Sequence, residues 1–348
     1  MSETETLMHI ANIGEFNLIA QLTKNLYAHD DVLLGVGDDC AILDVQSDVL
    51  LLATCDSQVE GVHFTLRTSS PEQIGRKALA VNISDIAAMG GIPRYALVSL
   101  ILPSTFSFEV LERIYVGMRQ EAEQYGVAIV GGNIAGSSKA EQLIIDITLL
   151  GTVERGHALT RQGARVGDTI FVTGPLGDSA AGLYTLLHAD MAYPQDAMEA
   201  LRLVHQVPRP RVHEGRALSQ LGPQIVTAML DISDGLSGDL AHLCERSQVG
   251  AHIEVGQLPL SAALLAIAIT AAQNPLDWAL HGGEDYELLF TVAAGKEQEV
   301  IEVVRLVSGT PVTAIGKVCS PDEGMQLLYP DGRVEKLVPN SWDHLKGK

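Results

Sequence analysis

The sequence predicts a mixed α/β protein with two domains, and three observations support this prediction. The chain has 348 residues, and domains average roughly 150 residues. Hydrophobic residues make up 47% of it, which supplies a large core and excludes a disordered chain. Aromatic residues are only 5% while glycine occurs 33 times, so small aliphatic residues dominate, as in tightly packed α/β proteins.

Strands and helices follow one another through the first half of the chain. Residues 49–55 form an apolar run typical of a buried strand. Ser70 and Pro71 then begin a helix, since serine caps the first turn and proline fits its first position. That helix ends at Met89, before two glycines and a proline. Further expected elements are a strand over 96–102, a helix over 108–125 capped by Ser107, and strands over 127–130 and 143–150.

The chain becomes polar and glycine-rich over residues 155–167, where we place the domain boundary. The predicted domains are residues 1–155 and 156–348. In the second domain the expected strands are 169–173, 226–232, 286–292 and 312–318, and the expected helices are 180–188 and 235–246. Residues 208–211 (PRPR) predict a rigid connector, and residues 327–334 predict a hairpin with an Asp-Gly turn.

Charge and cysteine usage exclude several classes of protein. The formal net charge is −20 and no Lys/Arg cluster is present, so a nucleic-acid partner is not expected. No apolar run approaches the roughly 20 residues of a membrane span. The four cysteines form no C-x-x-C pair, which removes support for zinc-knuckle and redox motifs. Sparse cysteines and an acidic N-terminus favour a cytoplasmic location.

Acidic residues recur beside glycine, serine or tight turns at the ends of apolar stretches. These clusters are Gly37-Asp38-Asp39-Cys40, Thr54-Cys55-Asp56, Ser84-Asp85, Asp231-Ile232-Ser233-Asp234-Gly235 and Gly282-Gly283-Glu284-Asp285. Carboxylates at the ends of buried elements can converge on one pocket. Converging hard oxygen ligands suit Mg²⁺, which in proteins usually serves phosphate chemistry.

Each cluster also has a structural interpretation. Asp38 and Asp39 fit a β-turn, and Asp234 fits an N-cap of the following helix. If residues 231–235 continue a strand, Asp231, Ser233 and Gly235 share one face. The acids at 284–287 fit a solvated loop, although the apolar run that follows places them at the mouth of a buried strand. Asp85 is the exception, because a carboxylate near a helix C-terminus needs a positive partner.

Two glycine-rich segments, 174–179 and 131–133, are candidates for holding a phosphate through backbone N–H groups. Each signal is weak alone. The motifs of P-loop, dinucleotide-binding and protein-kinase folds are absent, as are G-x-S-x-G and H-E-x-x-H.

Together these segments resemble the thiamine-phosphate kinase family, which belongs to the superfamily of aminoimidazole ribonucleotide synthetase, selenophosphate synthetase and hydrogenase-maturation proteins. The resemblance spans nearly the whole chain in order, and its most specific parts are LAVNISDIAAMGG (79–91), DISDGL (231–236) and GGEDYELLF (282–290). The matching stretches are Gly14-Glu15-Phe16, GDDCAIL (37–43), DSQVEGVHF (56–64), KALAVNISDIAAMGG (77–91), ALTRQGARVGD (158–168), TGPLGDSAAGL (173–183), DISDGLSGDL (231–240), GGEDYELLF (282–290) and Trp342-Asp343-His344.

The resemblance implies ATP-dependent phosphorylation of thiamine phosphate to thiamine diphosphate, with several Mg²⁺ ions and no dedicated catalytic acid or base. It implies an aminoimidazole ribonucleotide synthetase-like fold whose N-terminal sheets pair in a homodimer. The implied metal positions are Asp39, Thr54, Cys55, Asp56, Asp85, Asn133, Asp231 and Asp234. The implied ATP contacts are Tyr115, Gly132, Asn133, Arg161 and Ser233, and the implied substrate contacts are His63, Glu284 and Trp342.

Two positions depart from the family pattern. Asn133 stands where the family usually has aspartate, and an amide oxygen ligates a hard cation without contributing charge. Cys55 stands where a hydroxyl residue is common, so we expect any metal contact there through the backbone. His63, between Val62 and Phe64, is interpreted either as structural or as a neutral donor to an anionic substrate.

The expected reaction does not require a dedicated catalytic base. The second pKa of a phosphate monoester is about 6, so the acceptor is already an anion at neutral pH and needs no strong base. Repulsion between two anions is then the main obstacle, which metal ions and arginine offset. Two alternatives stay open: a superfamily relative that uses ATP on a different small acceptor, and a non-enzymatic acidic metal-binding protein.

Overall fold

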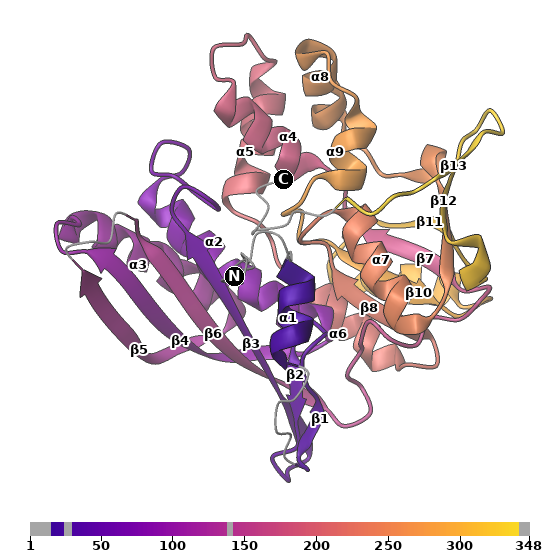
Figure 1. The fold of residues 1–348 in the computed structure, drawn as a ribbon, viewed down its shortest axis with the longest axis horizontal. Helices are drawn as coiled ribbons and strands as arrows, with labels where there is room; N and C mark the ends of the chain where they lie inside the picture. The colour runs from indigo at the N-terminus through magenta and orange to yellow at the C-terminus, as the bar shows by residue number, and fades with distance from the viewer. Residues whose placement is uncertain (1–14, 24–29, 138–141, 341–348) are drawn as a thin grey trace, which may run out of the picture.

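Two β-sheets organise the molecule, with helices packed on them (Figure 1). The computed structural model describes residues 15–23, 30–137 and 142–340. In that part of the chain, the six-stranded sheet has the order β1-β2-β3-β6-β4-β5 and the seven-stranded sheet the order β13-β12-β9-β11-β7-β10-β8. The predicted mixed α/β class is confirmed. None of the described helices is both long and apolar enough to cross a membrane.

The N-terminal sheet is covered by two long helices that contact each other at the level of the backbone. A Cβ on Gly75 would lie 1.8 Å from the Ile114 carbonyl oxygen, and a Cβ on Gly117 would lie 1.9 Å from that of Glu72. Glycine is therefore required at both positions for the helices to approach this closely. The elements are α1 (Glu15–Thr23), β1 (Val32–Leu34), β2 (Ala41–Leu43), β3 (Val49–Val59), α2 (Pro71–Ala88), β4 (Ile92–Pro103), α3 (Phe108–Tyr125), β5 (Ala128–Ser137) and β6 (Ile144–Glu154).

Both helix starts agree with the sequence. Ser70 caps α2 in a capping box with Gln73, and Ser107 caps α3. Two strand ends were predicted wrongly. Strand β3 continues to Val59, so Asp56 lies inside it, because every residue of β3 pairs with β6. Strand β5 continues through Gly132 and Asn133, because these residues pair in parallel with Val98 and Ser99 of β4.

Three strands at one end of the C-terminal sheet, β7, β10 and β8, are fully buried. The predicted strands, the connector and the final hairpin are present, whereas helices α5, α6, α8, α9 and α10 and strand β9 lie in segments for which we predicted no element. The elements are β7 (Thr169–Thr173), α4 (Asp178–Leu187), α5 (Gln195–Gln206), α6 (Val212–Leu221), β8 (Val226–Asp231), α7 (Leu236–Ser247), β9 (Gly250–Glu254), α8 (Ala262–Ala271), α9 (Pro275–His281), β10 (Leu288–Val292), α10 (Glu297–Val307), β11 (Val312–Cys319), the 3₁₀ turn η3 (Pro321–Glu323), β12 (Met325–Leu328) and β13 (Val334–Lys336).

Helix α2 joins the two halves of the molecule. Its C-terminal end packs on α6, where a Cβ on Gly215 would lie 2.1 Å from the Ala87 carbonyl oxygen. The same helix contacts β8 of the second sheet. Because α2 carries Asp85 and β8 ends at Asp231, this packing brings acids from the two halves together. The domain boundary at residues 155 and 156 stays a prediction.

Candidate functional site

Three carboxylates meet where α2 approaches β8. Asp39 precedes β2, Asp85 lies in the last turn of α2, and Asp231 is the last residue of β8. One oxygen from each lies within 4.8 Å of the others. Asp39 and Asp231 are buried, and Asp85 is half-buried. Acids that are far apart in the sequence thus form one compact cluster.

The cluster is electrostatically strained. Burial raises the pKa of Asp231 to about 7, and the charge of Asp39 adds to that rise. Burial also raises the pKa of Asp85 well above its usual value, with further contributions from Asp56, Asp231 and Asp39. Each carboxylate therefore resists ionisation beside the others. A bound cation would reverse this balance, because it favours the ionised form of every group around it.

The hydrogen-bond donors around the three carboxylates leave one carboxylate oxygen, Oδ2 of Asp39, available to such a cation. The hydroxyl of Ser84 donates to Asp231 at 2.6 Å, and the hydroxyl of Thr54 donates to Asp85. Arg161 pairs with Oδ1 of Asp39, whereas Oδ2 of Asp39 is buried and has no hydrogen-bond partner among the described residues. A buried, unpartnered carboxylate oxygen in an all-oxygen cluster fits a hard cation such as Mg²⁺.

Asp38 and Arg161 tie the Asp39 loop to the segment after the first sheet. The backbone N–H of Arg161 donates to the carboxylate of Asp38 at 3.1 Å, and Nε of Arg161 donates to Asp39 at 3.2 Å. Burial raises the pKa of Asp38 to about 7, and the neighbouring Asp39 adds to the rise. The two adjacent acids therefore share one arginine.

Residues 231–235 and 283–287 form paired loops beside the cluster. The N–H of Glu284 donates to the Ser233 carbonyl at 2.7 Å, and the N–H of Tyr286 donates to Ile232 at 2.9 Å. A Cβ on Gly283 would lie 2.5 Å from the Ser233 carbonyl oxygen, so only glycine allows this approach. Glu284 and Tyr286 both have positive φ, which marks strained backbone of the kind found at functional sites.

Two expectations for residues 231–235 are wrong. These residues do not share an alternating strand face, because β8 ends at Asp231. Asp234 is not the N-cap of α7 either; Gly235, at φ 103°, holds that position without a side-chain bond. Instead, Asp239 of α7 accepts the N–H groups of Ser233 and Asp234 at 3.1 Å each, which fixes this loop.

Glu284 links the two halves on the other side of the cluster. Its carboxylate lies 2.7 Å from Nζ of Lys77 on α2 and 3.3 Å from Nδ1 of His205 on α5. Burial alone would raise the pKa of Glu284, but Lys77, then His205 and His63, hold it below its usual value. Nδ1 of His63 accepts the Val59 N–H at 3.0 Å, so in the neutral ring Nε2 carries the hydrogen.

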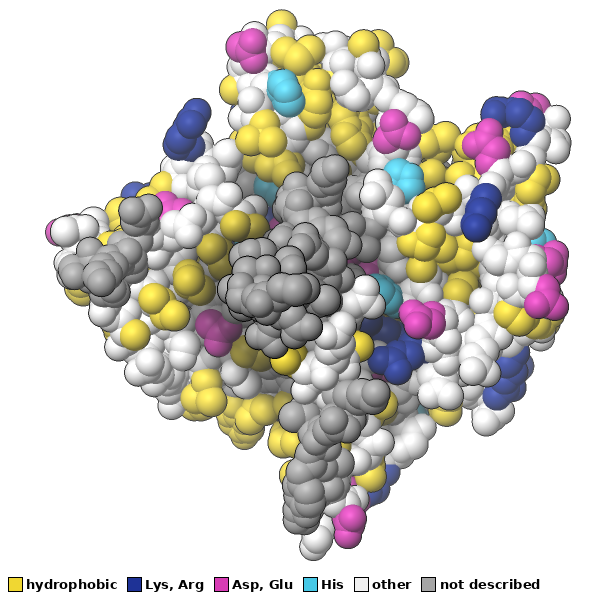
Figure 2. All heavy atoms as spheres, viewed as in Figure 1, with side chains coloured by type: hydrophobic (Ala, Val, Ile, Leu, Met, Phe, Trp, Pro, Cys, Tyr) yellow, Lys and Arg dark blue, Asp and Glu magenta, His cyan; other side chains and the backbone are white. Residues whose placement is uncertain are grey.

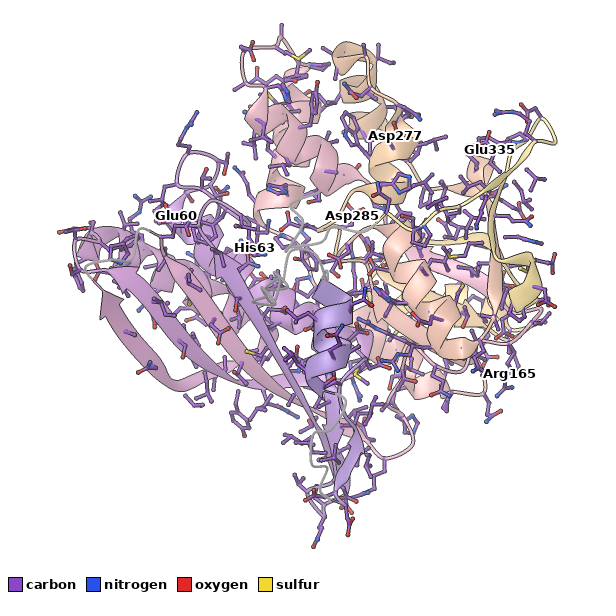
Figure 3. All side chains as sticks on the ribbon, viewed as in Figure 1. Glu60, His63, Arg165, Asp277, Asp285 and Glu335 are labelled. Carbon is purple, nitrogen blue, oxygen red and sulfur yellow. The ribbon has the colours of Figure 1, made fainter. Side chains whose placement is uncertain are left out.

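The other acids of the 282–287 motif have structural partners. Asp285 accepts the N–H groups of Gly177 at 2.6 Å and Ser179 at 3.1 Å. The segment 174–179, a candidate phosphate-binding turn from the sequence, therefore already binds a carboxyl group supplied by the protein. Glu287 pairs with Arg211 and accepts the hydroxyl of Thr173 at 2.6 Å. Figure 3 shows His63 and Asp285 near the middle of the molecule, on opposite halves.

Four expected site residues do not join the cluster through their side chains in the single chain. Gly132 and Asn133 lie on the edge strand β5, separated from β3 by β6 and β4, so segment 131–133 is a strand and not a turn. Tyr115 lies on α3 against the hydrophobic core. The sulfur of Cys55 faces Asp146 at 3.6 Å on the opposite face of β3 from Thr54. Trp342 lies outside the described residues.

Several site residues were not found from the sequence. Lys77 and Ser84 are buried polar residues of α2, and Asp239 is a buried acid of α7. Lys77, Ser84 and Asp85 have the i, i+7 and i+8 spacing that places side chains on one helix face. That polar stripe lies among the apolar residues of the C-terminal part of α2, and it was the signal in the sequence that would have revealed Lys77 and Ser84.

Comparison with known families covers most of the chain. Residues 37–153 match the family described as AIR synthase related protein, N-terminal domain. Residues 165–326 match AIR synthase related protein, C-terminal domain.

Similar proteins cover nearly the whole chain. The thiamine-monophosphate kinase of Bacillus subtilis is 38% identical over 96% of this chain and 100% of the relative. That of Aquifex aeolicus is 39% identical over 97% and 100%. Among solved structures, AaThiL complexed with AMPPCP and TMP has a TM-score of 0.84 at 38% identity, covering 98% of this chain and 100% of that chain. Thiamine monophosphate kinase of Stenotrophomonas maltophilia has a TM-score of 0.74 at 35% identity, covering 92% and 96%.

The role of Asp285 in stability is testable. Asp285→Asn replaces one acceptor oxygen by an N–H₂ group that faces a backbone N–H. We expect the free energy of unfolding to fall by about 2 kcal/mol, measured by urea unfolding. Asp277→Asn on α9 is the matched control, because Asp277 is an exposed acid (Figure 3). Equal stability of the two variants would contradict the structural role.

Proposed function

This chain belongs to the thiamine-monophosphate kinases of the AIR synthase related family, and on that premise we propose that it transfers a phosphoryl group from ATP to thiamine phosphate. The observation that carries the proposal is the convergence of Asp39, Asp85 and Asp231 within 4.8 Å. A solved structure of similar sequence and fold was determined with AMPPCP and TMP. The all-oxygen cluster suits the metal–phosphate chemistry that these two ligands require.

We propose that the cluster holds several Mg²⁺ ions. The residues that would hold them are Asp39, Asp56, Asp85, Asp231 and Asp234, with the backbone at Thr54 and Cys55. Bound Mg²⁺ would offset the negative charge of the two phosphate groups and orient them. Ser84 and Thr54 hold Asp231 and Asp85 in fixed orientations through hydroxyl donors, so these ligands need little reorganisation.

We further propose that the transfer is direct and in-line, without a general base. The phosphate of the acceptor is largely dianionic near neutral pH and can attack without losing a proton. The protein then contributes to catalysis by positioning the two phosphate groups and by compensating their negative charge. Arg161 lies against Asp38 and Asp39, where a guanidinium can also reach phosphate oxygens. Lys77 and His63 lie on the other side, around Glu284, where we expect thiamine phosphate.

The separation of Asn133 from the acid cluster supports a homodimer. In the sheet, Ser57, Asp146, Ser99 and Asn133 form one cross-strand row, and this row lies on the face opposite α2 and α3. Exposed apolar side chains of β4 flank Ser99 on this face: Tyr95, Leu97 and Ile101 have exposed fractions of 42–51%. Figure 2 shows hydrophobic side chains over β3 to β6. We propose that a second copy covers this face.

We also propose that the two domains are residues 1–155 and 156–348. A cytoplasmic location is proposed on the sparse cysteines, all of which are free thiols in the described structure.

The function is tested by an assay with ATP, Mg²⁺ and thiamine phosphate that measures thiamine diphosphate. For Asp56→Asn we expect kcat/KM to fall at least about 100-fold, because a charged ligand of the site is lost, and we expect half-maximal activity to need more Mg²⁺. Asp331→Asn, an exposed acid of the last hairpin, is the matched control and should match the wild type.

Two results would contradict the proposal. One is wild-type protein that forms no thiamine diphosphate and phosphorylates a different acceptor. The other is an unchanged Mg²⁺ dependence in Asp56→Asn, provided that circular dichroism shows a folded protein.

Direct transfer makes a separate prediction. Incubation with γ-labelled ATP alone should leave the denatured protein unlabelled, because no enzyme group accepts the phosphoryl. With thiamine phosphate added, the label should appear in thiamine diphosphate. Label that stays covalently attached to the protein in the absence of acceptor would overturn the direct mechanism.

The proposed dimer face is tested by Leu97→Glu. A two-fold interface would bury this carboxylate twice without partners, so we expect the dimer dissociation constant to rise at least about 100-fold in sedimentation experiments. Ile269→Glu on α8 is the control, because Ile269 is 82% exposed and lies on the other half. A dimer that resists Leu97→Glu and is broken by Ile269→Glu would reject this face.

A further inference from the structure

A second group of potential metal ligands lies far from the acid cluster. It consists of His252 on β9, Cys319 at the end of β11 and Glu323 in the 3₁₀ turn η3, whose ligand atoms all lie within 4.8 Å of one another. In the sheet, β7 and β10 separate β11 from β8, the strand that carries Asp231. The group is therefore independent of the phosphoryl-transfer site.

The register of the sheet brings His252 and Cys319 together. Lys317 pairs with His252, and Cys319 pairs with Gly250, so His252 and Cys319 are diagonal neighbours on one face. Gly250 leaves the room that the thiol occupies, because a Cβ there would lie 2.9 Å from Sγ of Cys319. The ammonium of Lys317 donates to Thr169 at 2.7 Å and so is directed to a partner on another strand.

Glu323 is oriented toward the histidine by its own turn. One carboxylate oxygen, Oε1, accepts the N–H of Ser320 at 3.2 Å in a capping box. The other, Oε2, lies 3.2 Å from Nε2 of His252. This nitrogen is shielded from solvent and makes no hydrogen bond to the described residues. A shielded ring nitrogen that lies close to a fixed carboxylate and a thiol but makes no hydrogen bond is an unsatisfied donor or acceptor.

The spacing fits a tetrahedral metal ion. Nitrogen and oxygen ligands lie about 2.0–2.1 Å from zinc, so two of them at a tetrahedral angle are separated by about 3.3 Å. The 3.2 Å between His252 and Glu323 agrees with that value. Imidazole and thiolate prefer zinc-like ions, whereas Mg²⁺ prefers oxygen alone. Three protein ligands leave a fourth position open.

We propose that His252, Cys319 and Glu323 bind one divalent cation of the zinc class. The ion would connect β9, β11 and the η3 turn, and would thereby stabilise this edge of the C-terminal sheet. This metal site does not depend on which acceptor the protein phosphorylates at the acid cluster.

The test is titration of the full-length, tag-free, chelator-treated protein with Co²⁺. With excess Mg²⁺ present to occupy the acid cluster, a thiolate-to-cobalt charge-transfer band should saturate at one Co²⁺ per wild-type chain, and Zn²⁺ should abolish it. Cys319→Ser should lack the band, and His252→Ala should bind at least about tenfold more weakly. Cys55→Ser is the matched control, because it removes an exposed thiol and should keep the band. Zn²⁺ should also raise the melting temperature of the wild type.

Three results would overturn the proposal: no charge-transfer band in the wild type with excess Co²⁺, a band that survives Cys319→Ser, or a band that is lost in Cys55→Ser. If Cys319→Ser does not fold, Glu323→Gln tests the proposal instead. Glu323 is exposed, so this variant should keep the fold and bind Co²⁺ more weakly than the wild type. Failure here leaves the kinase proposal standing, since that site uses oxygen ligands only.

Discussion

The contact between α2 and β8 is the constraint on which the rest of the structure depends. It holds Asp85 and Asp231, which burial and mutual repulsion would drive apart or keep protonated, within reach of Asp39. The hydrogen bond from Ser84 to Asp231 and the ion pair between Lys77 and Glu284 cross the same contact. The stability of the two halves is therefore coupled to the chemistry of the site, because folding energy offsets the cost of gathering these charges.

Local signals in the sequence predicted much of the fold. Ser70 and Ser107 marked both long helices of the first half, because capping depends on neighbouring residues alone. The ends of β3 and β5 were missed because pairing with β6 and β4 extends each strand past its apolar core. Helices α5, α6, α8, α9 and α10 were missed, although α5, α6 and α10 have the apolar periodicity of amphipathic helices. Pairing between strands that are far apart in the sequence cannot be predicted from the residues of one segment alone.

The candidate site shows the same division. The sequence identified Asp39, Asp85 and Asp231 as acids at the ends of apolar elements, and these three converge. It treated residues 284–287 as one acidic run, yet Glu284 faces α2, Asp285 binds the turn before α4, and Glu287 pairs with Arg211. Neighbouring acids separate in this way because two of the residues between Gly283 and Leu288 have positive φ. Backbone reversals of that kind leave no trace in composition.

The close packing of Gly215 on Ala87 fixes how the two halves of the molecule lie against each other. A Cβ at Gly215 would lie 2.1 Å from the Ala87 carbonyl oxygen, so α6 and α2 are in backbone contact and have little freedom to slide. Hinge motion of one half against the other would separate this contact and the cluster with it. The backbone contact between α6 and α2 therefore keeps the acids of the two halves together in the absence of a ligand.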